Sequence, residues 1–268
     1  FGGVGSALRY VLAKRIQREG IKVILQAEGV DELFAGYANY LPFFLLDAAK
    51  DRKFSDFRAS LREEDRRTIF KRMRSVSENP FGEYQDGTIF RQPDGTLKDD
   101  FKTDMPDIPR PFSSHLINRQ FQDLKQLKLP RVLRINDRLS MACGLEFREP
   151  FLDHRLVEYA FGLASNAKIK DHSSKYAIRL MMRERLPEAV RLEPKRPVVT
   201  PQREWLRDQL RPEVEQLIHD QRFVERGIFD PKHVQTQYKN YVENHSENSF
   251  FVWQWINSEL WFREFVDL

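Results

Sequence analysis

The stretch Ile21–Tyr37, IKVILQAEGVDELFAGY, decides how this chain folds. Its first part, Ile21–Ala27, is a short apolar run rich in β-branched residues, which is typical of a buried strand in a parallel sheet. Before it, residues 6–19 place apolar side chains at helical spacing, and Gly20 provides a helix stop. A helix, a glycine and a buried strand make half of a βαβ unit, so the sequence predicts an α/β fold.

Three carboxylates, Glu28, Asp31 and Glu32, follow this strand at the end where open α/β sheets bind ligands. Mg²⁺ prefers one or two carboxylates together with ligand oxygens, so Asp31 is a candidate for holding Mg²⁺ against phosphates. Glu28 is a candidate for accepting or steering a proton. The alternative is structural, because acids at a helix start are also favoured by the helix dipole and the free N–H groups.

Two further stretches carry candidate residues. Residues 137–154 predict a helix, a glycine stop, a short strand and a new helix capped by Asp153, with Cys143 as a small core residue. Lys175 and Lys195 lie in basic loop segments, and the proline-flanked Lys195 suits anion binding by a fixed cation. A solvated basic loop is the alternative for both lysines.

The region 77–112 differs from the rest because it holds eight prolines and glycines. We expect an exposed, mobile excursion there, with a turn at Pro93–Gly95. The chain after it is mostly helical. The predicted segments are 113–128, 131–143, 152–163, 173–185, 201–220, 231–243 and 248–266.

The composition excludes several classes of protein. The 268 residues are 41% hydrophobic, which excludes a disordered chain, and no apolar run is long enough to span a membrane. The net charge of +4 is small and dispersed, so we expect no nucleic-acid partner. A single cysteine fits a reducing, cytoplasmic setting. The first residue is not Met, and we expect the chain to be a fragment.

Together, Val23–Tyr37 (VILQAEGVDELFAGY), Asp137–His154 (DRLSMACGLEFREPFLDH) and the region around Pro194-Lys195 resemble the synthetase domain of the glutamine-dependent asparagine synthetase family. The resemblance covers nearly the whole chain, in the same order. It implies that residues 1–268 are the C-terminal part of such a domain. The implied fold is a partial parallel sheet of the ATP-pyrophosphatase (adenine nucleotide alpha-hydrolase-like) type with a mostly helical C-terminal portion.

The resemblance also implies a ligase activity with ATP and Mg²⁺. In the family, aspartate attacks the α-phosphate of ATP to give an acyl-adenylate, and ammonia from a glutaminase domain then yields asparagine. Glu28 corresponds to the acid that assists ammonia, and Asp31 to the acid that coordinates Mg²⁺-pyrophosphate. Lys195 corresponds to the catalytic lysine, and Lys175 supports cofactor binding. A homodimer through an N-terminal domain is implied, and the isolated fragment is expected to be inactive.

Some positions depart from the family pattern. The Ser-Gly-Gly-x-Asp-Ser pyrophosphate loop does not occur in this chain, Ala27 replaces a glycine, and Arg131 stands where an acid is common. Pro197-Val198 replaces the usual Gly-Phe after the lysine. Three alternatives therefore stay open: a β-lactam-synthetase-like enzyme, an amide ligase for another carboxylate, and a non-catalytic scaffold. The acid at Glu28 disfavours the first, since β-lactam synthetases carry a tyrosine there.

Overall fold

The computed structural model describes residues 3–53, 66–78, 92–102, 109–171, 173–196, 200–244 and 248–267. The chain divides into two compact units, each with its own core. One unit comprises residues 10–83 and 107–197 and is called the sheet unit below. The other comprises residues 1–9, 84–106 and 198–268 and is called the helical unit.

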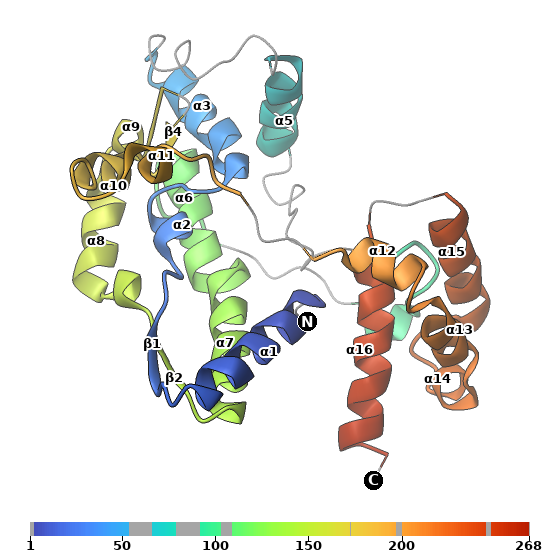
Figure 1. Cartoon of the computed structure of the whole chain (residues 1–268). Coiled ribbons are helices and arrows are strands. Elements are labelled where there is room, and N and C mark those ends of the chain that lie inside the picture. The colour runs from blue at the N-terminus through green and yellow to red at the C-terminus, as the bar shows by residue number, and fades with distance from the viewer. Residues whose placement is uncertain are drawn as a thin grey trace. The chain divides into compact units, whose positions relative to one another are not determined.

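The sheet unit is built around two short parallel strands, β1 (Val23–Leu25) and β2 (Glu146–Arg148), which lie side by side in Figure 1. Their register pairs Ile24 with Phe147. Helix α1 (Gly5–Arg18) precedes β1, and Gly20 ends it with a φ of 76°. The predicted helix–glycine–strand order and the parallel pairing are therefore confirmed, and the fold is mixed α/β with a small sheet.

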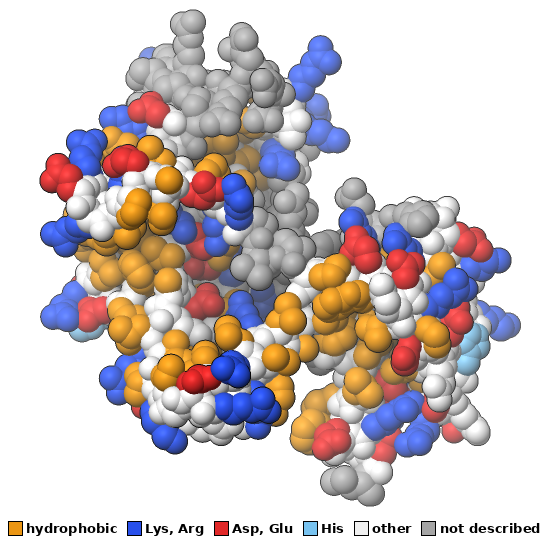
Figure 2. Space-filling view, in the orientation of Figure 1, with side chains coloured by type: hydrophobic (Ala, Val, Ile, Leu, Met, Phe, Trp, Pro, Cys, Tyr) orange, Lys and Arg blue, Asp and Glu red, His pale blue; other side chains and the backbone are white. Residues whose placement is uncertain are grey.

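The prediction of a buried first strand is wrong in one respect. Ile24 packs against a small cluster of Ala13, Cys143 and Leu145, but Val23 is 41% exposed and Leu25 is 69% exposed. A strand is buried on both faces only where helices cover both, and packing is found here on one face of the described two-stranded sheet. Figure 2 shows that hydrophobic side chains remain on the surface of both units. Cys143 is a fully buried core residue, as predicted.

Helices make up most of the sheet unit. Its larger core contains Tyr40, Phe44 and Leu116, and a second cluster contains Leu33 and Phe34. The helices are α2 (Val30–Leu33), α3 (Leu41–Lys50), α5 (Arg66–Glu78), α6 (His115–Gln122), a π-helical turn (Asp123–Leu127), α7 (Leu129–Ala142), α8 (His154–Gly162), α9 (Ser165–Lys168), α10 (Tyr176–Met181) and α11 (Glu188–Arg191). Short 3-10 turns occur at Ala38–Tyr40 and Pro150–Leu152, and a two-residue hairpin pairs β3 (Ile169–Lys170) with β4 (Ser173–Ser174).

The helical unit packs around the fully buried Trp255. Its helices are α12 (Gln202–Arg207), α13 (Arg211–His219), α14 (Gln221–Glu225), α15 (Pro231–Glu243) and α16 (Phe250–Phe265). The prediction for 231–243 matches α15. The single helix predicted over 201–220 is broken after Arg207, because a continuous helix would bring the Pro212 ring against the carbonyl of Asp208.

The expected excursion at 77–112 is described only in part. Residues 79–91 and 103–108 lie outside the described residues. In the described segment 92–102, the predicted turn is present, with the Thr96 amide donating to the Pro93 carbonyl at 3.1 Å. Thr96 is fully buried, and Leu97 forms an antiparallel bridge with Phe229, a core residue of the helical unit. A 3-10 turn, Asp99–Phe101, follows.

Among the helices of the described ranges, none combines the length and the apolar character that crossing a membrane requires.

Candidate functional site

The end of β1 leads directly into the turn that carries the acidic residues. Gly29 adopts a left-handed conformation, with φ at 90°, and Leu152 lies so close that a Cβ at this position would overlap its side chain. Glycine is therefore required both for the conformation and for the approach. It starts α2, which places Asp31 and Glu32 in the first helical turn.

Asp31 brings together two lysines that are distant in the sequence. Lys175 Nζ lies 2.6 Å from Asp31 Oδ1, and Lys195 Nζ lies 2.8 Å from Oδ2. The Asp31 side chain is 13% exposed, whereas that of Lys195 is 37% exposed. Three of the predicted site residues thus meet at the carboxyl end of β1, with a carboxylate between two ammonium groups.

The pKa of Asp31 reflects two opposing effects. Burial alone would raise it, but the ammonium groups of Lys175 and Lys195 outweigh burial and hold the pKa below its usual value. Asp31 is therefore ionised at neutral pH. The two lysines place ammonium groups at a half-buried position, where they could donate hydrogen bonds to a phosphate ligand.

The backbone around this cluster is constrained. A Cβ at Gly36 would overlap Asp31 Oδ1 and lie 2.8 Å from Asp31 Cγ, so this position must be glycine. Ala35 and Lys175 both have positive φ values, 54° and 55°, which non-glycine residues seldom adopt. The Lys175 amide also donates to the Phe34 carbonyl at 3.0 Å. Such unfavourable conformations cluster at functional sites, where the surrounding structure fixes them.

Glu28 lies at the start of the same turn and has its own partners. Its carboxylate accepts a hydrogen bond from Asn136 Nδ2 at 3.2 Å, and its amide donates to Glu149 Oε2 at 3.2 Å. Asn136 also donates to Gln26 Oε1, at 3.1 Å. Glu28 is close enough to Tyr37 to raise the pKa of that phenol, as Asp31 does. Glu28 therefore belongs to the same electrostatic environment as the Asp31 cluster.

Tyr37 is a residue of this site whose role the sequence did not indicate. Its hydroxyl donates to Glu32 Oε1 at 2.9 Å, and burial, followed by the Glu32 charge, raises the pKa of Tyr37 above its usual range. Burial also raises the pKa of Glu32, which is 3% exposed, although the Tyr37 hydrogen bond opposes the rise. Lys128 Nζ lies 3.8 Å and Lys195 Nζ 5.9 Å from the centroid of the Tyr37 ring. In the sequence, the position of Tyr37 as an aromatic residue next to Gly36 is the feature that could have indicated such a role.

A buried polar pair, Gln120 and Lys168, supports the far end of α2. Gln120 Nε2 donates to the carbonyls of Glu32 and Leu33, at 2.5 and 3.0 Å. Lys168 Nζ donates to Gln120 Oε1 at 2.9 Å, and both side chains are fully buried. An ammonium can only donate hydrogen bonds, so Lys168 holds the oxygen of the Gln120 amide, and the NH₂ group of that amide therefore points toward α2. Neither residue carried a signal in the sequence, because the contact joins three separate segments.

The site offers a metal ion a single carboxylate among its described residues. Where the structure is described, no group of three or more His, Cys, Asp or Glu side chains is placed to hold a metal by itself. Asp31 offers one carboxylate, and Mg²⁺ commonly takes one or two carboxylates together with phosphate oxygens. Both oxygens of this carboxylate lie within 2.8 Å of a lysine ammonium, so a Mg²⁺ ion would have to share Asp31 with Lys175 and Lys195.

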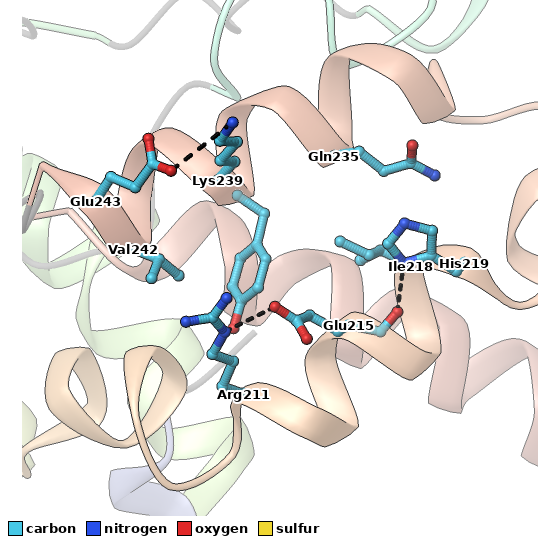
Figure 3. A pocket seen from close by; sticks show the side chains of 9 residues that line it. Arg211, Glu215, Ile218, His219, Gln235, Lys239, Val242 and Glu243 are labelled. Atoms are coloured by element: carbon cyan, nitrogen blue, oxygen red, sulfur yellow. Dashed lines mark hydrogen bonds and ion pairs between the residues drawn. The ribbon is translucent and has the colours of Figure 1, made fainter.

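A groove of about 350 Å³ lies elsewhere, in the helical unit between α13 and α15 (Figure 3). Its charged side chains are paired with each other: Arg211 with Glu215 at 2.7 Å and Lys239 with Glu243 at 3.8 Å. His219 Nδ1 lies 2.7 Å from the Glu215 carbonyl. The groove pairs its acids and bases one to one, whereas the Asp31 cluster has two ammonium groups to one carboxylate, so the groove is the weaker candidate for an anionic ligand.

Comparison with known proteins gives consistent results. A Mycobacterium tuberculosis protein provisionally named asparagine synthetase [glutamine-hydrolyzing] is 28% identical over 72% of this chain and 32% of its own length. Asparagine synthetase [glutamine-hydrolyzing] 1 of Bacillus subtilis is 23% identical over 94% of this chain and 42% of its own. Amidase chyE of Penicillium rubens is 25% identical over 83% of this chain and 38% of its own.

The chain therefore spans well under half the length of the curated relatives it matches. No solved structure was found to match it. The family model for asparagine synthase matches residues 1–263, nearly the whole chain. This chain belongs to the asparagine synthase family.

Proposed function

We propose that this chain is part of a ligase that activates a carboxylate with ATP and converts it into an amide. The observation that carries the proposal is the convergence of Lys175 and Lys195 on Asp31 at the carboxyl end of β1. Family membership supports it. The proposed fold around the site is a parallel sheet of the ATP-pyrophosphatase type.

In the first step, a carboxylate oxygen of the substrate attacks the α-phosphorus of ATP, and the bond to the β-phosphate breaks. The products are an acyl-adenylate and pyrophosphate. Lys195 faces the reacting phosphate and stabilises the negative charge that develops there, and Lys175 binds the departing pyrophosphate. Asp31 would hold Mg²⁺, which supplies further charge neutralisation on the phosphates when bound.

In the second step, ammonia attacks the acyl carbon and AMP leaves with the electrons of the broken C–O bond. Nitrogen must lose a proton as the amide forms, and Glu28 accepts it. The Asn136 hydrogen bond holds the Glu28 carboxylate in place, at 3.2 Å. Ammonia would come from the hydrolysis of glutamine by a separate domain, and aspartate is the first substrate to test. Other carboxylates are the alternative, since two relatives are named amidases.

The test is aspartate-dependent exchange of labelled pyrophosphate into ATP, measured with this chain together with any sequence that precedes it in its gene. We expect exchange in the unaltered protein and none in Lys195→Ala, because the change removes charge stabilisation without removing core packing. Glu28→Gln should slow ammonia-dependent amide formation more than exchange. Full exchange in Lys195→Ala would refute the assignment. A folded protein that binds neither ATP nor pyrophosphate would favour the scaffold alternative.

A further inference from the structure

Lys128 is a largely buried lysine near the Asp31 cluster. Its side chain is 7% exposed, and Nζ lies 3.8 Å from the centroid of the Tyr37 ring. Within the described part of the chain, this ammonium makes no hydrogen bond or ion pair. Two acids that act on Tyr37 are already engaged, because Asp31 pairs with Lys175 and Lys195, and Glu32 accepts from Tyr37.

An ammonium on a largely buried side chain is unfavourable without an anion, because the surrounding protein displaces part of its water. The ring of Tyr37 offsets part of this cost, since the face of an aromatic ring attracts cations. Part of the desolvation cost of the ammonium is not offset by the ring. An incoming anion would therefore bind more strongly here than beside a solvated lysine. Charge-assisted hydrogen bonds to oxyanions also strengthen when water is excluded.

The same ring connects Lys128 to the proposed reaction site. Lys195 Nζ lies 5.9 Å from the Tyr37 centroid, so one aromatic ring holds two ammonium groups within 6 Å. The Tyr37 hydroxyl is anchored on Glu32 at 2.9 Å, which fixes the position of the ring. Lys128 immediately precedes α7, and Lys195 comes from a loop beyond α11. Two distant segments therefore bring an ammonium group close to the same ring.

We propose that Lys128 and Lys195 together form an anion-binding position over Tyr37. Its ligand is an oxyanion, supplied either by the pyrophosphate part of the nucleotide or by a carboxylate of the substrate to be amidated. This inference rests on the proposed function and adds to it a second charged contact that selects the ligand. Lys128 is buried, so its side chain has little freedom to move. Lys195 is more exposed, so its side chain can adjust its position to the ligand.

The test measures binding by calorimetry to this chain together with any sequence that precedes it in its gene, with two probes: inorganic pyrophosphate in the presence of Mg²⁺, and L-aspartate. Lys128→Met removes the charge and keeps a side chain that packs well on an aromatic ring. Lys128→Gln is a second neutral variant, and Lys128→Arg retains the charge. Lys125→Met is the matched control, because Lys125 is exposed three residues away. Circular dichroism verifies that each variant is folded.

We expect Lys128→Met and Lys128→Gln to weaken the binding of one probe at least tenfold, while Lys128→Arg and Lys125→Met stay within twofold of the unaltered chain. Loss confined to pyrophosphate assigns the position to a phosphate, and loss confined to aspartate assigns it to a carboxylate. Both affinities within twofold in the neutral variants would overturn the inference, as would binding of neither probe to the unaltered chain.

Lys195→Met separates this result from the proposed function. If Lys195→Met weakens pyrophosphate binding and the neutral Lys128 variants do not, the proposed function stands and the Lys128 position is refuted. If Lys195→Met also has no effect on either probe, both proposals fail.

Discussion

The substitution Lys168→Met should make the stability of the sheet unit less dependent on pH. Lys168 is fully buried, donates to Gln120 Oε1 at 2.9 Å and lies 5.4 Å from the centroid of the Phe161 ring. Burial lowers the pKa of its ammonium from 10.5 to about 8. A folded-state pKa below the unfolded value means that the charged lysine opposes folding.

The size of the effect follows from that difference. Each tenfold change in proton affinity is worth about 1.4 kcal/mol, so below pH 8 the charged Lys168 costs about 3 kcal/mol. The unfolded chain binds more protons than the folded chain between the two pKa values. Stability therefore rises with pH in this window, by about 2 kcal/mol from pH 7 to pH 9.5. Lys168→Met loses this rise, and it also leaves Gln120 Oε1 without its donor, at a cost of about 1–3 kcal/mol.

The assay is urea unfolding at pH 7 and pH 9.5, followed by far-ultraviolet circular dichroism. The unaltered chain and Lys168→Met should have similar stabilities at pH 7, and at pH 9.5 the variant should be less stable by about 2 kcal/mol more than at pH 7. All four tryptophans, residues 205, 253, 255 and 261, belong to the helical unit. Tryptophan fluorescence therefore reports on the unfolding of the helical unit. A stability difference that is equal at both pH values would refute the reasoning.

Three further predictions concern the Asp31 cluster. Gly36→Ala should lower the free energy of unfolding by about 1–3 kcal/mol and weaken pyrophosphate binding at least tenfold, because the added Cβ overlaps Asp31. Urea unfolding measures the first effect and calorimetry the second. Unchanged pyrophosphate binding would contradict the geometry. The lysines lower the pKa of Asp31, so the unaltered chain should lose stability as the pH falls below about 4, and Asp31→Asn should not show this loss. If the free energy of unfolding falls equally steeply with pH in both proteins, the prediction is wrong. Tyr37→Phe should cost about 1–3 kcal/mol, because the buried Glu32 carboxylate loses its donor, and a variant as stable as the unaltered chain in urea would count against that hydrogen bond.

The sequence predicted local features well where one segment determines them. Residues 231–243 form a helix with the predicted bounds, because an acid cap, a proline at the first position and regular apolar spacing all agree. A parallel sheet was also predicted, although the sequence did not indicate that β1 pairs with β2. The break within 201–220 was missed because the apolar spacing continues across it, although Pro212 lies inside the stretch.

The site was predicted as a set of residues and not as a set of contacts. Asp31, Lys175 and Lys195 were chosen from their motifs, and only the fold reveals that the two ammonium groups share one carboxylate. Lys128 and Lys168 escaped notice, because a lysine in a sequence is normally a solvated side chain. Their burial depends on what distant segments place around them, and spacing along the chain carries no information about that.

The contact between Asp31 and Lys195 has a consequence for how the protein folds. The two residues are separated by 164 positions, so their approach closes a very long loop. Ordering such a loop costs conformational entropy, and a half-exposed ion pair supplies too little free energy to offset it. We therefore expect the packed clusters around Phe44 and Leu33 to form before this ion pair is completed. Mild destabilisation of those clusters should thus disassemble the cation cluster before the local helices melt.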